Sequence, residues 1–257
     1  MTIGPVEVLT TRVLPVAVDE AGSVVTAWAA DAEARVVCAA NVHMVMEAWD
    51  DGVFAAALNG ADLTVCDGRP LVWACRLQGV RDARQTRGLD LMNEVCARAA
   101  RRGLPVGLYG ASPAVVQAVR QRLCTSHPEL QVSYCWSPPY RELSPAEDDA
   151  AVQAIREAGV RLLFVSLGCP RQERWMFAHR DRLPCVALGV GAAFDMLAGV
   201  VPVAPRWMQT LGLEWALRLV KEPRRLWRRY ALHNGRFVVL VGRAWLARRM
   251  KRPASGP

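Results

Sequence analysis

Asp67 is the residue whose type and position point most directly to chemistry. It follows the apolar run 63–66 and precedes Gly68. If that run is a buried strand, the carboxylate lies at the strand's end, where partial burial would make it a usable general base. An aspartate that closes a turn or caps the next helix would explain the same position. Asp195, after the glycine-containing segment 189–194, could likewise be a catalytic carboxylate or a helix cap, and the helix cap is the favoured interpretation.

Glycine and polar residues also follow other predicted strands. Glycine lets a backbone approach a ligand closely, and free N–H groups at a helix start favour a phosphate. Each segment alone is explained by an ordinary tight turn, but several at strand ends favour a nucleotide or sugar-phosphate site. The candidate substrate-binding residues there are Asn41, Gly110, Ala111, Ser112, Gly168, Arg171, Gln172, Glu173, Gly191, Phe194 and Asp195.

Two arginines, Arg84 and Arg87, precede Gly88 and could hold a diphosphate, or they could form a solvated basic loop. The four histidines are scattered, without an HxH or HExxH pattern, and Asp-x-Asp is absent. The sequence therefore predicts no metal site and no bound cofactor.

Short apolar runs and longer amphipathic segments alternate through the first 200 residues. Continuous apolar strands that alternate with helices are typical of a parallel sheet covered on both faces. We expect a doubly wound, mostly parallel, Rossmann-like α/β sheet whose ligands bind beyond the carboxyl ends of the strands. The predicted strands are 36–39, 63–66, 106–109, 130–133, 162–165 and 186–188, and the predicted helices are 43–58, 71–77, 89–102, 114–123, one opening at 144–147, and 172–182.

The last 52 of the 257 residues differ in charge from the rest. Residues 206–257 contain 13 Lys and Arg against 2 acidic residues, whereas residues 1–205 contain 19 against 22. Trp207, Leu211, Trp215 and Leu219 are spaced for one helical face, and 234–235 (Asn-Gly) predicts a helix stop. We expect a catalytic domain over 1–201 and a basic helical appendage over 202–257.

Eight cysteines occur without a CxxC pair, which favours buried free thiols in a reducing cytosol over disulfides. The amino-terminal segment lacks signal-peptide character, and no uncharged apolar run reaches the roughly 20 residues that a spanning helix needs. A protein that is soluble, or that lies on a membrane without crossing it, fits both observations. With 52% hydrophobic and 22% charged residues, the chain can bury a large core, which excludes global disorder.

The order of these segments resembles the WecG/TagA/CpsF family of bacterial glycosyltransferases, glycosyltransferase family 26. The resemblance runs from about Val13 to Phe237. Its most specific part is G-C-P-R-Q-E at 168–173, followed by G-A-A-F-D at 191–195 and G-L-E-W at 212–215. The other stretches that carry it are 61–68, 87–92, 174–175, 198–199, 204–207, 218–219 and 222–223.

The resemblance implies an inverting, metal-independent transfer of a sugar from a UDP-sugar to a polyprenyl-diphosphate-linked saccharide. Asp67 matches the family's proposed base, Asn41 the Asn of its Thr-Pro-Asn stretch, and Gln172 with Glu173 its Gln-Glu pair. Two departures stand out: Ala39 and Ala40 replace the Thr and Pro, and the family's arginine falls on Gln85, between Arg84 and Arg87. Because Ala39 lacks the hydroxyl of the family's threonine, we expect a donor outside the amino-sugar branch, with glucose as the first choice.

The basic appendage predicts a helix lying among the headgroups of an anionic leaflet, on the cytoplasmic face of the cell membrane. Each basic residue near such a surface contributes about 1 kcal/mol. A packed, Arg-rich helix of a homo-oligomer is the alternative. The arginines expected to contact the membrane or the diphosphate are Arg218, Arg224, Arg225, Arg228 and Arg229.

Three other classes compete with a glycosyltransferase. A nucleic-acid binder would use the basic end but leave the strand-end loops without a role, so we expect no nucleic acid partner. A nicotinamide-dependent oxidoreductase requires GxGxxG after the first strand, and the segment 39–43 lacks it. A non-catalytic sugar-nucleotide binder would bind UDP and show no turnover.

Overall fold

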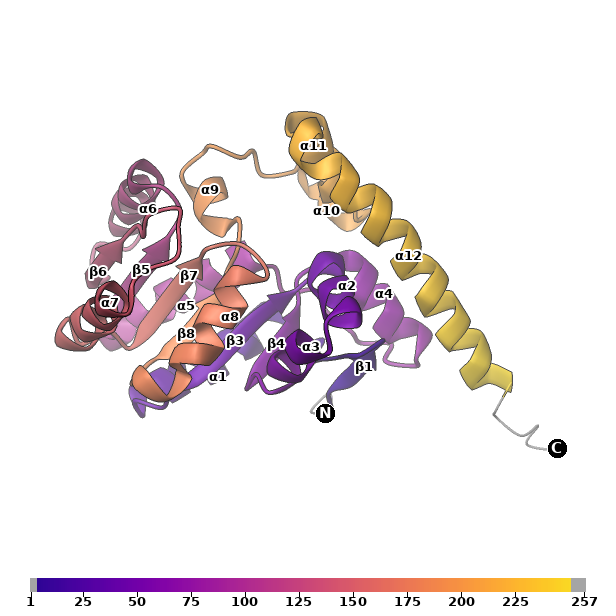
Figure 1. Cartoon of the computed structure of the whole chain (residues 1–257), viewed down its shortest axis with the longest axis horizontal. Coiled ribbons are helices and arrows are strands. Elements are labelled where there is room, and N and C mark those ends of the chain that lie inside the picture. The colour runs from indigo at the N-terminus through magenta and orange to yellow at the C-terminus, as the bar shows by residue number, and fades with distance from the viewer. Residues whose placement is uncertain (1–3, 251–257) are drawn as a thin grey trace.

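The computed structural model describes residues 4–250, without the side chains of Arg225 and Arg229. Its centre is a six-stranded, fully parallel sheet in the order β4-β3-β8-β7-β5-β6 (Figure 1). This confirms the predicted α/β sheet and its helical C-terminal appendage. The strands are β3 (Arg35–Ala40), β4 (Leu63–Cys66), β5 (Val106–Gly110), β6 (Val132–Trp136), β7 (Leu162–Ser166) and β8 (Val186–Gly189).

The strand register brings the residues after β3, β4 and β8 to one edge of the sheet. Ala40 lies beside Cys66 of β4, and Cys38 lies beside Gly189 of β8. The backbone N–H of Asp67 then donates to the carbonyl of Ala40 at 2.8 Å. Side chains from different strands therefore converge at this edge, as the parallel arrangement requires.

Helices cover both faces of the sheet and bury one apolar cluster on each face. Five of the strands read as nearly continuous apolar runs because both of their faces lie against these clusters. The exception is the edge strand β6, which is only partly buried and lies at Val132–Trp136 rather than at the predicted 130–133. One face carries α1 (Val18–Ala30), α5 (Gly88–Arg102), α6 (Pro113–Ser126) and α9 (Ala193–Leu197). The other carries α2 (Val42–Asp50), α3 (Gly52–Asn59), α4 (Arg69–Leu77), α7 (Pro145–Glu157) and α8 (Arg171–His179).

Two predicted helices are shorter than expected. The segment 43–58 forms α2 and α3, which are separated by Asp51 in an extended conformation. The Asp51 carboxylate accepts from the N–H groups of Val53 and Phe54, so it starts a new helix rather than continuing the old one. Similarly, α8 ends at His179 and a short 3₁₀ helix, η1 (Arg180–Arg182), follows.

An amino-terminal hairpin, β1 (Val6–Val8) with β2 (Thr11–Val13), was not predicted from the sequence. Each of these strands has only three residues, which is too short to show a period-two pattern clearly. The inward-facing residues Val8 and Val13 are buried in the same apolar cluster as α2 and α3.

The C-terminal region forms α10 (Arg206–Thr210), α11 (Glu214–Lys221) and α12 (Pro223–Met250). The single face expected over 207–219 is broken at Gly212, whose φ of +69° suits glycine. A Cβ there would lie 2.9 Å from the Trp73 ring, so close packing on α4 also requires glycine.

The predicted helix stop at 234–235 is wrong, because α12 continues through it. A glycine inside a helix costs about 1 kcal/mol relative to alanine, which tertiary packing can offset. Phe237, just beyond the glycine, is 3% exposed and packs into the core cluster with Leu240 and Val241. Contacts with the body of the protein therefore hold the second half of α12 in place.

In Figure 1, α12 runs diagonally past α2 and α4. Contacts between α12 and α2 tie the appendage to the sheet-containing body. Across residues 4–250, no helix combines the length and the apolarity needed to cross a membrane.

Candidate active site

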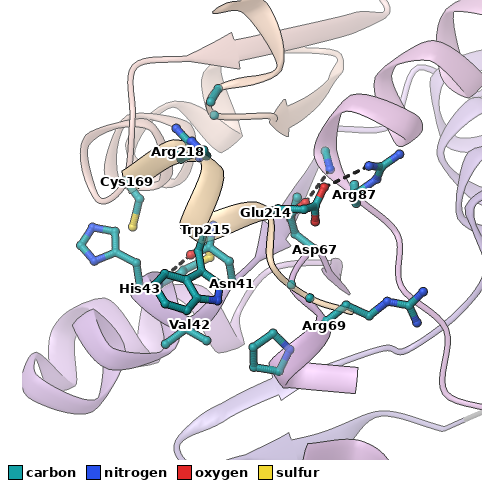
Figure 2. Close-up of a pocket in the computed structure, with 18 of the residues that line it drawn as sticks. Asn41, Val42, His43, Asp67, Arg69, Arg87, Cys169, Glu214, Trp215 and Arg218 are labelled. Carbon is teal, nitrogen blue, oxygen red and sulfur yellow. Dashed lines mark hydrogen bonds and ion pairs between the residues drawn. The ribbon is translucent and has the colours of Figure 1, made fainter. Parts of the chain in front are cut away.

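A cavity of about 800 Å³ lies between the carboxyl edge of the sheet and the C-terminal helices (Figure 2). Its walls come from the ends of β3, β4, β7 and β8, from α4, and from α11 and α12. Its lining contains charged side chains from both the sheet edge and the appendage. The polar residues in this lining include Asn41, Asp67, Arg87, Ser166, Gln172, Asp195, Glu214 and Arg218.

Asp67 lines the cavity and lies immediately after β4. Its Oδ1 accepts from the N–H of Gly88 at 2.9 Å, and the Asn41 side chain also hydrogen-bonds to the carboxylate. Burial raises the pKa of Asp67 from 3.8 to about 6, and the negative charge of Glu214 adds to the increase. The hydrogen bonds from Gly88 and Asn41 and the positive charge of Arg218 act in the opposite direction. The carboxylate is therefore ionised at neutral pH yet more basic than an ordinary aspartate.

Glu214, the first residue of α11, extends from the appendage into the part of the cavity that contains Asp67. Its Oε1 accepts from Nη1 of Arg87 at 3.0 Å, and its Oε2 lies 3.5 Å from Nε2 of Gln85. The same Gln85 amide donates to the backbone carbonyl of Asp67 at 2.6 Å. Sequence reasoning included Glu214 only within the G-L-E-W stretch and missed it as a site residue. The glycine at 212 that lets α11 approach α4 was the available signal.

The two candidate arginines before Gly88 lie in different environments. Arg84 is exposed and does not line the cavity, whereas Arg87 is in its wall. Arg87 is held by Asp90, with 2.6 Å between Nε and Oδ2, as well as by Glu214. The geometry therefore favours Arg87 over Arg84 as a contact for a bound diphosphate.

Gln172 and Glu173 form a buried pair at the start of α8. Gln172 lines the cavity, and its Oε1 accepts from the N–H of Gly191 at 3.2 Å. Its Nε2 donates to Oε1 of Glu173 at 2.5 Å. Glu173 itself is fully buried and outside the lining, and burial raises its pKa. Glu173 therefore lies outside the cavity wall and fixes the orientation of the Gln172 side chain through this hydrogen bond.

The other predicted binding residues divide into two groups. Ala111, Gly168, Gly191 and Asp195 line the cavity, together with Asn41 and Gln172. The remaining ones do not line it and have evident structural contacts. Ser112 caps α6 and Phe194 is buried in the core. The exposed guanidinium of Arg171 lies 5.2 Å from the centre of the Tyr140 ring.

Gly110 also lies outside the lining, but it shapes the sheet edge. Its φ is +118°, and a Cβ there would come within 2.3 Å of the Ser166 carbonyl oxygen. Only glycine allows β5 and β7 to end this close together. The Ser166 hydroxyl, at the cavity wall, in turn donates to the carbonyl of Gly191 at 2.7 Å.

Aromatic and aliphatic side chains form an apolar part of the cavity lining. α4 contributes Trp73, Ala74 and Leu77 to this apolar part. The appendage contributes Trp215, Leu217, Tyr230, Phe237, Val238 and Val241. One continuous cavity can therefore accept a ligand that has a charged portion and a hydrocarbon portion.

The predicted membrane arginines are distributed along α11 and α12. Arg218 lines the cavity, whereas Arg224 and Arg228 are exposed, with the guanidinium of Arg228 lying 5.4 Å from the centre of the Trp227 ring. The side chains of Arg225 and Arg229 lie outside the described part of the structure.

Comparison with known proteins gives one family and a curated relative. The model of the glycosyl transferase WecG/TagA/CpsF family matches residues 6–251. The N-acetylglucosaminyldiphosphoundecaprenol N-acetyl-beta-D-mannosaminyltransferase of Bacillus subtilis (strain 168) is 28% identical over 195 residues, which are 76% of this chain and 74% of the relative.

Proposed function

The chain belongs to the WecG/TagA/CpsF family and is a glycosyltransferase, and we propose that it transfers a sugar from a UDP-sugar to a polyprenyl-diphosphate-linked saccharide. The product would enter an exopolysaccharide or another cell-surface polymer. The observation that carries the proposal is Asp67, a desolvated carboxylate with a pKa of about 6, facing a cavity lined by both charged and apolar side chains.

The acceptor class follows from the relative's name and the shape of the cavity. The Bacillus subtilis enzyme is named for an N-acetylglucosaminyl-diphosphoundecaprenol acceptor, which has a sugar, a diphosphate and a long hydrocarbon chain. In this chain, apolar lining residues such as Trp73, Leu77 and Val241 fit hydrocarbon, whereas Arg87 and Arg218 supply positive charge to the same cavity. A lipid-linked sugar diphosphate matches both portions.

In the proposed reaction the acceptor hydroxyl attacks the anomeric carbon of the donor sugar. Asp67 takes the hydroxyl proton, the new carbon–oxygen bond forms, and the bond from the anomeric carbon to the UDP oxygen breaks. Attack from the face opposite UDP inverts the anomeric configuration. A general base at this position contributes typically about 10²–10⁴-fold to the rate.

The departing UDP gains negative charge as its bond to the sugar breaks. Fixed positive or N–H groups aimed at that charge would stabilise the transition state. We assign this role to Arg87, Arg218 and the backbone at Gly168 and Gly191, all of which line the cavity. Arg87 would exchange part of its contact with Glu214 for the diphosphate.

The donor sugar is proposed from the residues before Asn41. Ala39 lines the cavity, and neither it nor Ala40 carries a hydroxyl that could hold an acetamido or carboxyl group. Glucose is therefore the donor sugar that we propose.

The appendage, taken as 202–257, would hold the enzyme on the inner face of the cell membrane. Exposed apolar side chains on α10–α12 include Trp207, Trp227 and Leu232, and exposed basic ones include Arg224 and Arg228. Such a combination supplies both the apolar and the electrostatic terms of interfacial binding.

The decisive experiment is a panel of UDP-sugars tested with a polyprenyl-diphosphate-linked acceptor. Transfer from one donor, lost in the Asp67→Asn variant, would support the proposal. Binding of UDP-sugars without transfer from any member of the panel would instead indicate a non-catalytic binding protein.

A further inference from the structure

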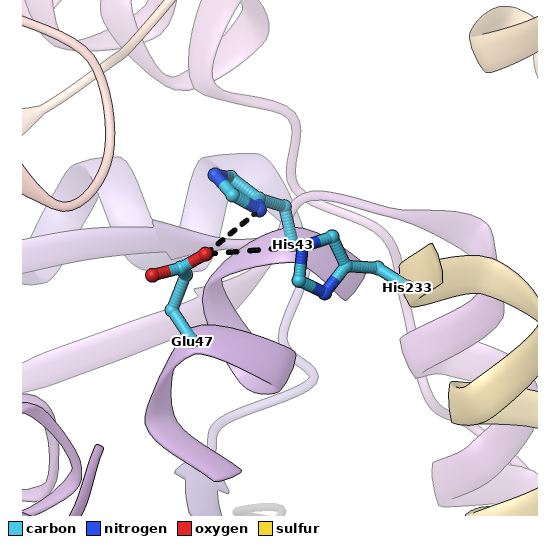
Figure 3. A group of neighbouring side chains, drawn as sticks. All are labelled: His43, Glu47 and His233. Carbon is cyan, nitrogen blue, oxygen red and sulfur yellow. Dashed lines mark ion pairs between the residues drawn. The ribbon is translucent and has the colours of Figure 1, made fainter. Parts of the chain in front are cut away.

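Three potential metal ligands meet where α12 crosses α2 (Figure 3). His43 and Glu47 are one helical turn apart on α2, so both side chains lie on the same face of the helix. His233 comes from α12 and faces them. Nδ1 of His43 lies 3.6 Å and Nε2 of His233 lies 3.8 Å from Oε1 of Glu47.

We propose that His43, Glu47 and His233 form a zinc site that clamps α12 onto α2. Two imidazole nitrogens and a carboxylate oxygen are a common set of protein ligands for this ion. Because a tetrahedral zinc ion with bonds of about 2.0–2.1 Å holds its ligand atoms about 3.3 Å apart, the two contacts to Glu47 need shortening by only about half an ångström. The three ligand atoms already lie within 4.8 Å of one another.

Burial and charge at this position suit a dication. The side chains of His43 and His233 are 14% and 15% exposed, and that of Glu47 is 32% exposed, so the cluster is sheltered but reachable. With neutral imidazoles the three ligands carry one negative charge. Among the described side chains of α12, Arg236 is a neighbouring cation, and it is paired with Asp50 at 2.7 Å, so its charge is already compensated.

The cluster is separate from the proposed catalytic contacts. The groups that act on the Asp67 carboxylate are Gly88, Asn41, Glu214 and Arg218, and none of them belongs to it. His43 and His233 do line the cavity, so a fourth zinc ligand could be a water molecule on that side. The ion would hold α12 in the position where its apolar residues complete the cavity wall. The site is defined by these contacts alone and does not depend on the proposed function.

No sequence pattern pointed to this site, and the proposal departs from the expectation of no metal. The pair at 43 and 47 is a spacing found on many helices, and the third ligand is far away in the chain. Only the docking of α12 brings His233 to the pair.

The test is zinc binding to the full-length protein after removal of bound metal, measured by equilibrium dialysis and titration calorimetry. We expect one zinc ion per chain. His43→Gln and His233→Gln should each weaken binding by more than the roughly 10–100-fold that loss of a supporting partner causes. His127→Gln, a partly buried histidine at the end of α6, is the matched control and should bind normally.

Two further readouts keep the test independent of activity. Zinc at about 100 times its Kd should raise the Tm of the wild-type protein by about 5–10 °C, and should not do so in the variants. Substitution with Co²⁺ should give a spectrum without a thiolate charge-transfer band, because the ligands contain no sulfur. If either histidine variant is unstable without metal, Glu47→Gln replaces it in both measurements.

Equal zinc binding by the wild type and the histidine variants would overturn the proposal. So would a thiolate band in the Co²⁺ protein, which would place the metal on accessible cysteines such as Cys124 or Cys169. Absence of binding by the wild type at micromolar zinc would also overturn it.

Discussion

Asp67→Asn should make the protein more stable at neutral pH while removing most of its activity. Burial and Glu214 raise the pKa of this carboxyl from 3.8 to about 6, a difference of about 2 units. At about 1.4 kcal/mol per unit, ionisation of Asp67 opposes folding by up to about 3 kcal/mol. Because the residue is partly accessible to the cavity, we expect the variant to gain about 1–3 kcal/mol. The asparagine Oδ1 can still accept from Gly88, so the contact at 2.9 Å is kept.

The gain should depend on pH in a defined direction. Below pH of about 4 the carboxyl is protonated in both the folded and the unfolded chain, so the variant and the wild type should be equally stable. Between about pH 4 and 6 only the unfolded chain releases the proton, and the difference in unfolding free energy grows. Above pH 6 it should stay constant. Urea unfolding of both proteins at pH 5, 6, 7 and 8 measures the change.

Asp51→Asn is the matched control, because Asp51 is the opposite case. Its carboxylate caps α3 and pairs with Arg174, and these contacts lower its pKa. Neutralising it should therefore destabilise the protein at neutral pH. A gain in stability for both variants would reflect a general effect of reduced negative charge and not the burial of Asp67.

Activity provides the second half of the same test. We expect Asp67→Asn to lower kcat by about 10²–10⁴-fold at pH 7.5. In the wild type, kcat/KM should fall by about tenfold per pH unit below 6, as the base becomes protonated. Near-normal turnover in the variant, or a variant less stable than the wild type at pH 7.5, would refute the reasoning.

Three further predictions concern the groups around Asp67 and the appendage. Glu214→Gln should lower the pKa of Asp67, because a neighbouring negative charge is removed, and the acidic limb of the kcat/KM profile should move to lower pH; an unmoved limb would exclude this coupling. EDTA should leave transfer by the His233→Gln variant unchanged. This variant lacks the proposed zinc site, so chelation tests only whether the transfer itself needs a metal, and arginines are assigned to the leaving diphosphate. Rescue of a chelated enzyme by Mg²⁺ or Mn²⁺ would contradict this. Truncation after Val201 should release the protein from anionic vesicles in a co-sedimentation assay. The double variant Arg224→Glu, Arg228→Glu should bind the vesicles more weakly, and its binding should depend less on salt. Equal sedimentation of truncated and full-length protein would place the membrane contact elsewhere.

Local patterns in the sequence determined the body of the fold. Five of the six strands of the main sheet were found from continuous apolar runs, because a parallel strand covered on both faces has no polar side. The edge strand β6 is only partly buried and was predicted two residues too early. The α7 start was found from Ser144 and Glu147, which form the expected reciprocal cap. Asp67 could be singled out in advance because a polar residue directly after a buried strand must lie at the sheet edge.

Only the tertiary structure decided what surrounds that edge. The position of Glu214 beside Asp67, and of His233 beside His43, depends on how the appendage packs on the body. Sequence spacing reports neighbours within a few turns, whereas these contacts join residues that are far apart in the chain. The same limit explains the error at 234–235, where local propensity predicted a stop and the packing of Phe237 against the core kept the helix intact.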